Sequence, residues 1–189
     1  NLNAAGRVLF VNCAFPTLGQ DAVPPQPVII GTNCKHPYTT SSLINISGMS
    51  YGALSKPAVL ALSTGAKAAG CWMNTGEGGL SPYHLEGGAE IVFQIGTAKN
   101  GVSDLNGVLD DDKLVEVASH SQVKMFEIKM SQGAKPGKGG ILPGEKVTEE
   151  IAAIRGVEVG KDAYSPNRHP DISSFDDLID MINRVRNVT

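Results

Sequence analysis

Short apolar runs alternate with glycine-rich polar loops along most of the chain, and segments of helical periodicity follow several of these loops. Four runs have the length and composition of β-strands, and they lie at residues 43–47, 72–74, 91–95 and 125–129. Repeated β–α units require parallel strands, so the loops at the carboxyl ends of the strands meet at one edge of the sheet. The pattern therefore predicts an α/β fold whose functional residues lie on those loops.

Helix signals occur after three of the four predicted strands. Serine, threonine or aspartate stands at each predicted start, where it can cap free backbone N–H groups. The predicted helices run from Ser55 to about Ala69, from Asp110 to about Ser119, from Thr148 to Gly156, and from Ser173 or Ser174 onward. The apolar stripe of the last helix consists of Phe175, Leu178, Ile179, Ile182 and Val185. Between the second and third strands, residues 82–88 leave room for little helix.

Four β–α units are half of a (β/α)8 TIM barrel, which takes about 250 residues when complete. Residues 43–189 are therefore predicted to form the first half of such a barrel, strands 1–4. A half-barrel exposes two apolar sheet edges, so we expect the rest of the barrel or a partner subunit to cover them. Residues 1–42 are rich in proline and predicted to be an irregular leader or covering segment, with short strand candidates at 8–11 and 28–31.

Composition excludes several functional classes. The 189 residues carry a net charge of −3, which gives no indication of a nucleic-acid or anionic-membrane partner. No apolar run approaches the roughly 18 residues of a membrane span. The cysteines Cys13, Cys34 and Cys71 form no metal-binding spacing, and the four histidines lie in no metal pattern either. We expect a cytoplasmic protein with reduced thiols and without a metal site.

The loop after the fourth predicted strand concentrates candidate chemistry. Lys129, Gln132, Lys135 and Lys138 are interspersed with glycines there. Cations on a glycine-rich backbone at the carboxyl end of a strand suit an anionic ligand. The alternative is a mobile surface loop with solvated lysines. The glycine spacing matches neither the P-loop nor the dinucleotide-binding fingerprint.

Three motifs occur in order: GMSYGALSK at 48–56, NTGEGG at 74–79 and IKMSQGAKPG at 128–137. Residues 94–102 and 165–172 add support. Over residues 43–186 the chain resembles the FMN-binding synthase domain of glutamate synthase, including its short glutamate-synthase-like members. The resemblance implies a flavin-containing (β/α)8 barrel that adds ammonia to 2-oxoglutarate and reduces the resulting imine to glutamate.

The resemblance also implies the residues that contact FMN. They are Gly48, Met49, Ser50, Tyr51, Thr75, Gln94 and Lys129. Three of these assignments have a simpler alternative. Residues 48–51 could be an ordinary tight turn, Gln94 a core residue bonded to backbone, and Lys129 a lysine extending into solvent.

Lys129 and Glu77 are the catalytic candidates. Reduced flavin carries negative charge near N1, and a fixed ammonium group such as that of Lys129 would stabilise it. Glu77 has the alternative of being a solvated loop acid. Gln132 and Lys135 resemble the family's residues on the substrate side, where cations and amides hold the dicarboxylate.

The implied partners are 2-oxoglutarate, ammonia or glutamine-derived ammonia, an electron-donor protein or reductase subunit, and the rest of the barrel. No cysteine here matches those that hold an iron–sulfur cluster in the family, so a cluster would belong to the full-length protein and not to this chain. The loop at 167–170 departs from the family's proline- and histidine-rich form. Because the phosphate-binding loops after strands seven and eight are missing, we expect the isolated chain to be inactive and to bind FMN weakly or not at all. Two alternatives remain: N-methylglutamate formation from methylamine, and a non-catalytic split or scaffold module.

Overall fold

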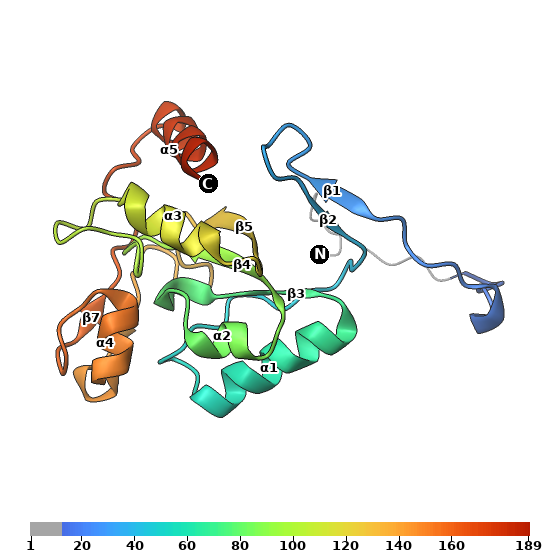
Figure 1. Ribbon diagram of the computed structural model, residues 1–189, viewed down its shortest axis with the longest axis horizontal. Coiled ribbons are helices and arrows are strands. Elements are labelled where there is room, and N and C mark those ends of the chain that lie inside the picture. The colour runs from blue at the N-terminus through green and yellow to red at the C-terminus, as the bar shows by residue number, and fades with distance from the viewer. Residues whose placement is uncertain (1–12) are drawn as a thin grey trace, which may run out of the picture.

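The computed structural model describes residues 13–189 and has a three-stranded parallel sheet at its centre (Figure 1). The strand order is β3 (Trp72–Asn74), β4 (Glu90–Ile95), β5 (Val123–Ile128). These strands confirm the predictions at 72–74, 91–95 and 125–129 to within two residues. The strand candidate at 8–11 lies outside the described residues.

The segment predicted as the first strand, 43–47, does not form one. It runs parallel to β3 but makes a single bridge, between Ile46 and Met73. The side chain of Asn45 accepts a hydrogen bond from the backbone N–H of Trp72 at 3.1 Å and so takes the place of a ladder bond. The domain is therefore mixed α/β with three parallel strands, one fewer than the predicted half-barrel, and it is consistent with part of an α/β barrel.

The four predicted helices are present, and a short fifth one lies where little helix was expected. They are α1 (Lys56–Ala69), α2 (Pro82–Glu86), α3 (Asp111–Ser119), α4 (Glu149–Arg155) and α5 (Phe175–Val188). Gly70 ends α1 in the left-handed conformation with φ 65°, which glycine adopts without strain. Among residues 13–189, no helix combines the length and the apolar character that crossing a membrane requires.

The central strand β4 is buried on both faces, as is usual in parallel sheets. Figure 1 shows α1 and α2 on one side of the sheet and α3 and α5 on the other. Met73 and Ile91 pack with Val59 and Ala66 of α1. The second cluster joins the sheet to α3 and α5, and its buried members include Phe93, Ile95, Leu114, Val117, Met181 and Val185.

The predicted apolar stripe of α5 is partly wrong. Phe175 is 85% exposed and Ile179 is 52% exposed, whereas Met181 is buried. The helix touches the core through Leu178, Met181 and Val185, which are spaced by three and four residues. The periodicity predicted the helix correctly. The face of the helix that packs on the core is narrower than the predicted apolar stripe and is centred on a different side of the helix.

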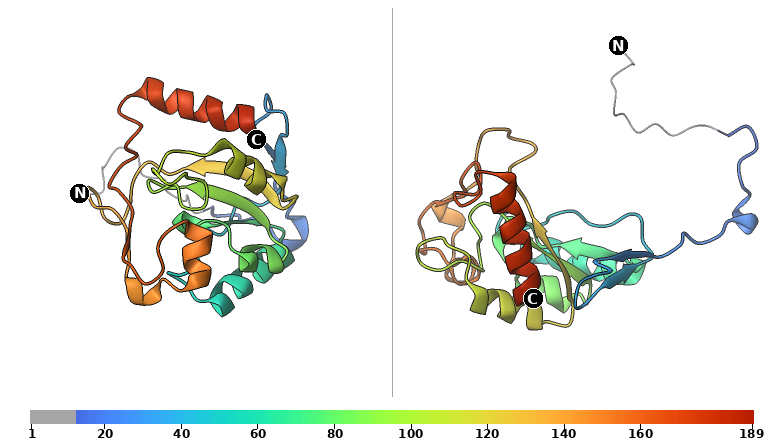
Figure 2. Two further views of the ribbon diagram at one scale, coloured as in Figure 1. Left: turned by 60° about the vertical axis from the view of Figure 1, so that its left-hand side comes forward. Right: turned by 90° about the horizontal axis from the view of Figure 1, so that it is seen from above.

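The amino-terminal segment extends from the body, as the right-hand view of Figure 2 shows. It contains the one-turn helix η1 (Gly19–Asp21) and an antiparallel pair, β1 (Val28–Ile30) with β2 (Tyr38–Thr40). The strand expected at 28–31 is therefore present and one residue shorter, and its side chains are exposed. Tyr38 of β2 is buried, and its hydroxyl donates to Glu90 of β4 at 2.5 Å, which ties the segment to the body.

A small unit follows β5, and within it only the helix was predicted. It consists of the antiparallel pair β6 (Ile141–Leu142) and β7 (Ala163–Tyr164), the turn η3 (Gly144–Lys146) and helix α4. Leu142, Val147 and Ile151 form its core. The unit brings the end of α4 and the loop after β7 back toward the sheet.

The start of α3 depends on one side chain. Asp110 Oδ1 accepts hydrogen bonds from the backbone N–H groups of Asp112 at 3.0 Å and Lys113 at 3.2 Å. We expect Asp110→Ala to lower the free energy of unfolding by about 1 kcal/mol in urea denaturation, because two N–H groups lose their partner. Glu116→Ala, on the exposed side of the same helix, is the control and is expected to change stability little. Equal stability of the two variants would contradict the cap.

Candidate functional site

The predicted site segments meet at the carboxyl edge of the sheet. The backbone N–H of Met49 donates to the Asn74 carbonyl at 3.1 Å, which joins the 48–51 turn to the end of β3. The Thr75 N–H donates to the Val92 carbonyl at 3.0 Å, and the Lys129 N–H donates to the Ile95 carbonyl at 3.0 Å. Three motifs far apart in sequence thus form one continuous edge.

Glycines form the floor of this edge. A Cβ atom on Gly48 would lie 2.9 Å from Gln94 Oε1, and one on Gly76 would lie 2.6 Å from the backbone nitrogen of Ser50. Gly76 also has φ +67°, which other residues rarely adopt. At Gly96 the nearest atom would be Glu77 Cβ, 3.2 Å away. The strand ends therefore approach one another more closely than side chains would allow.

Two buried side chains near this floor, Thr75 and Asn74, form hydrogen bonds with neighbouring main-chain groups. The Thr75 hydroxyl donates to the Gly76 carbonyl at 3.0 Å and accepts from the Gln94 N–H at 3.0 Å. Asn74 Oδ1 accepts from the Gly76 N–H at 2.8 Å. Asn74 holds the turn η2 (Gly76–Gly78), and sequence reasoning did not single it out. The Gln94 side chain is 4% exposed and lies between Gly48 and Gly96.

Glu77 and Gln132 are brought into direct contact. The Gln132 amide donates to the half-buried Glu77 carboxylate at 2.7 Å. The main chain of Glu77 is also held, because Asn100 Nδ2 donates to its carbonyl at 2.8 Å. The loop after β5 therefore folds back over the edge at this point and places an amide beside a carboxylate.

The lysines of the loop differ in their placement. Lys129 is half-buried directly after β5, and its ammonium group has no ion-pair partner among residues 13–189. Lys135 and Lys138 are exposed in the loop, which projects outward in Figure 2. The structure brings Lys129 and Gln132 to the edge and leaves Lys135 in solvent.

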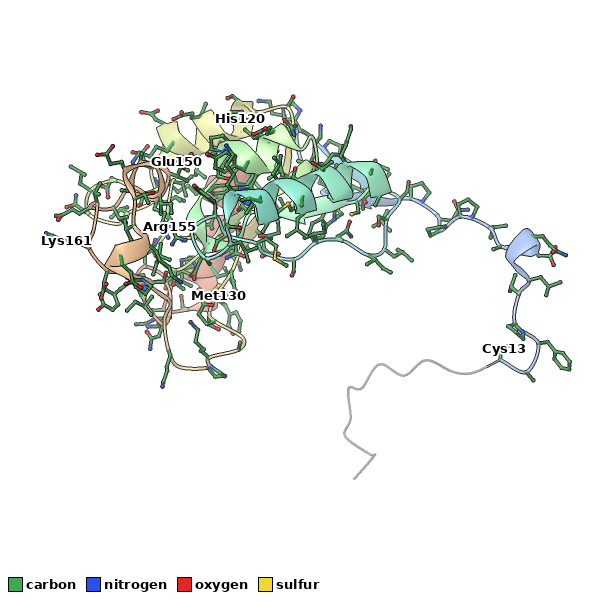
Figure 3. The ribbon with its side chains drawn as sticks, turned by 90° about the horizontal axis from the view of Figure 1, so that it is seen from below. Cys13, His120, Met130, Glu150, Arg155 and Lys161 are labelled. Atoms are coloured by element: carbon green, nitrogen blue, oxygen red, sulfur yellow. The ribbon has the colours of Figure 1, made fainter. Side chains whose placement is uncertain are left out.

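The side chain of Tyr51 points away from the edge, toward α4. Its hydroxyl donates to Glu150 Oε2 at 2.6 Å, and Tyr83 donates to the other carboxylate oxygen of Glu150 at 2.5 Å. Figure 3 labels Glu150 and Arg155, both of α4. Burial and the Glu150 carboxylate raise the pKa of Tyr51, so its hydroxyl stays protonated. At residue 51 the main chain, and not the ring, belongs to the edge.

Three buried side chains from outside the sheet hold carbonyl groups of the edge. His84 Nε2 lies 2.8 Å from the Met49 carbonyl, and His169 Nε2 lies 3.0 Å from that of Lys129. Arg155, which is 5% exposed, donates from Nη2 to the Tyr51 carbonyl at 3.2 Å. Sequence reasoning missed these groups, because a donor to a distant carbonyl leaves no local signal.

Both histidines make stability depend on pH. Burial lowers the pKa of His84 and of His169, so both rings are neutral in the folded chain. In the unfolded chain they titrate near pH ~6.5, and below that pH the unfolded state binds protons that the folded state does not. The free energy of unfolding therefore falls with decreasing pH, by up to about 1.4 kcal/mol per pH unit for each histidine until the lowered pKa is reached.

Urea denaturation at pH 7.5, 6.5 and 5.5 measures this dependence. We expect His84→Gln to reduce the slope below pH ~6.5, since one titrating ring is removed. His120→Gln is the matched control, because His120 is exposed. A wild-type stability that stays constant down to pH 5.5 would contradict buried neutral histidines.

The chain belongs to the glutamate synthase family. The family model described as the conserved region in glutamate synthase matches residues 16–189, nearly the whole chain. The match begins within the segment that the sequence pattern assigned to a leader.

Curated relatives agree with this assignment. The chain is 46% identical over 162 residues to the glutamate synthase large subunit-like protein YerD of Bacillus subtilis, covering 85% of this chain and 31% of that protein. It is 40% identical over 146 residues to the archaeal-type glutamate synthase [NADPH] of Thermotoga maritima, covering 77% and 26%. A glutamate synthase large subunit-like protein of Rhizobium meliloti is 35% identical, covering 86% and 34%. The chain thus spans about a third or less of the length of these relatives.

Proposed function

We propose that this chain is part of an FMN-dependent glutamate synthase, which converts 2-oxoglutarate and ammonia to glutamate by reductive amination. The observation that carries the proposal is the carboxyl edge of the sheet. There the glycine floor, the main chain of Lys129 and the Glu77–Gln132 pair meet, and the Lys129 ammonium group has no ion-pair partner among the described residues. Membership of the glutamate synthase family supports the reaction class.

The residues of the edge fit a flat heteroaromatic ring. Gly48, Gly76 and Gly96 let the turns and strand ends of this edge pack closely on one another, and the Gln94 carboxamide supplies a donor and an acceptor there. FMN would supply hydride transfer when bound. The 48–51 turn, Thr75, Gln94 and Lys129 would hold it, with Thr75 acting through the turn that it stabilises.

Lys129 and Glu77 have separate roles in the proposal. The positive charge of Lys129 stabilises negative charge that develops on the cofactor, because a fixed cation costs no reorganisation during the reaction. The Glu77 carboxylate holds or moves a proton next to the substrate. The Gln132 amide leaves the Glu77 carboxylate and donates to a substrate carboxylate instead. The exposed Lys135 adds positive charge where the dicarboxylate enters.

The proposal includes partners beyond this chain. In the described residues the outer edge of β5 has no paired strand, and it faces an apolar groove of about 540 Å³ between β5, α5 and the β1–β2 pair. Together with the greater length of the relatives, the groove supports completion of the sheet by the rest of a barrel or a partner subunit. An electron donor protein or reductase subunit is also required. The three free cysteines support a reducing, cytoplasmic location.

Mixing the reduced protein, as its gene encodes it, with 2-oxoglutarate and ¹⁵N-ammonia tests the reaction. We expect flavin reoxidation together with ¹⁵N-labelled glutamate. Methylamine in place of ammonia tests the alternative, since efficient N-methylglutamate formation would favour an N-methylglutamate-forming enzyme. Tight assembly with a partner but no turnover with either amine would favour the scaffold module.

A further inference from the structure

Two buried histidines contact opposite ends of the candidate site from outside the sheet. His84 is the third residue of α2, and it is fully buried. Its Nδ1 accepts from the backbone N–H of Ser81 at 3.1 Å and lies 2.7 Å from the Ser81 hydroxyl. Since Nδ1 is the acceptor, the proton is on Nε2, which donates to the Met49 carbonyl.

His169 has a similar arrangement at the other end of the site. Its Nε2 faces the Lys129 carbonyl, which can only accept, so the proton is again on Nε2. The fully buried ring leaves Nδ1 without a hydrogen-bond partner among the described residues. A histidine kept only for packing would be better replaced by an apolar residue, so the Nε2 contact explains its presence.

The loop that carries His169 is fixed to the end of β4. The Thr97 hydroxyl donates to the Pro166 carbonyl at 2.6 Å, and the buried Lys99 ammonium pairs with Asp171 at 2.7 Å. His169 lies between these two anchors. Its ring is therefore held in place before it meets Lys129, as a positioning group must be.

We propose that His84 and His169 are positioning residues. Each fixes the main-chain carbonyl of one site residue: His84 that of Met49 in the 48–51 turn, and His169 that of Lys129 after β5. The main chain of Lys129 is then held on both sides of its Cα atom. Its N–H donates to the Ile95 carbonyl, and its carbonyl accepts from His169. The base of the Lys129 side chain is thereby fixed. The catalytic meaning of this role rests on the proposed function, whereas the positioning itself does not.

Paired glutamine and asparagine variants test whether a donor at the position of Nε2 is what matters. In His169→Gln the side-chain amide can donate from about the position of Nε2, whereas in His169→Asn it is too short. The same pair applies to His84. The protein as its gene encodes it is used, and the first readout is amide hydrogen exchange without cofactor, followed for segments 48–52 and 125–132.

We expect His169→Asn to raise exchange in 125–132 by about tenfold, the effect of losing one hydrogen bond, and to leave 48–52 unchanged. His84→Asn is expected to do the reverse, and each Gln variant to restore most of the protection. Equal effects on both segments, or no effect in a folded variant, would overturn the proposal.

The second readout is bound FMN. His169→Asn is expected to lower its midpoint potential, as loss of Lys129 would, whereas His84→Asn weakens FMN binding about tenfold without moving the potential. A shift in potential with His84→Asn and none with His169→Asn would contradict the assignment of His84 to the 48–51 turn and of His169 to Lys129. Segment-specific exchange in a protein that binds no FMN would refute the proposed function and leave the positioning role standing.

Discussion

Replacement of Lys129 by methionine is expected to lower the midpoint potential of bound FMN by at least about 30 mV and to reduce kcat by about 100-fold. Lys129 is half-buried at the end of β5 and has no ion-pair partner in the described part of the chain, so its charge is available to a ligand. A positive charge stabilises the reduced, more negative cofactor more than the oxidised one, and its removal makes reduction harder.

Spectroelectrochemical titration and steady-state kinetics measure the two effects. Lys138→Met is the matched control, because it removes a lysine from the exposed loop nine residues further along. An unchanged potential in the Lys129 variant, with full flavin occupancy, would remove Lys129 from the cofactor site.

The second large effect is expected at Gly76. An alanine there must adopt φ near +67° and would place its Cβ 2.6 Å from the Ser50 nitrogen. Left-handed backbone and overpacking each cost about 1–3 kcal/mol, so Gly76→Ala is expected to destabilise the chain by about 2–6 kcal/mol and to abolish FMN binding. The contact to be displaced is main chain of the 48–51 turn, which cannot move aside as a flexible side chain would.

Thermal or urea denaturation and a flavin titration test this prediction. Gly133→Ala is the control, since a Cβ at Gly133 would have no atom within 4 Å. A Gly76→Ala protein as stable as the control, with normal flavin uptake, would show that the glycine floor is not needed.

The helices and the buried strands were predictable, because residues within or next to each element determine where it begins and ends. Helix α4 begins just after Thr148, whose side chain accepts a hydrogen bond from the Ile151 N–H, and both α1 and α4 end at a left-handed glycine, Gly70 and Gly156. The side chain of Ser55, just before α1, makes no capping hydrogen bond, and the proline in the first turn marks that start instead. The buried parallel strands were also predictable, since their apolar runs are short and bounded by glycine or polar residues.

Tertiary contacts decided what the sequence pattern predicted wrongly. Segment 43–47 has the composition of a strand, but the Asn45 side chain bonds Trp72 and leaves a single bridge. The buried side of α5 depends on how the helix lies against β5, so Met181 is buried where Ile179 was expected. The β6–β7 pair joins residues more than twenty positions apart, and no local periodicity reports such pairing.

For the site, the motifs predicted which segments meet but not how each side chain is used. Glu77, Gln94, Lys129 and Gln132 do gather at one edge, because the carboxyl ends of parallel strands share that edge. Tyr51 contributes only main chain, and its ring bonds Glu150 about a hundred residues away in sequence. The histidine and arginine donors from α2, α4 and the loop after β7 are visible only once the chain is folded.

The central claim is that the glycine-floored edge binds FMN, and an equilibrium FMN titration followed by flavin absorbance and fluorescence tests it most directly. It is made on the protein as its gene encodes it, on its Gly76→Ala variant and on residues 1–189 alone. We predict one FMN per wild-type chain, none in the variant, and weak or no binding by residues 1–189. A wild-type protein that takes up no flavin, or a variant that binds it as well as the wild type does, would contradict the account.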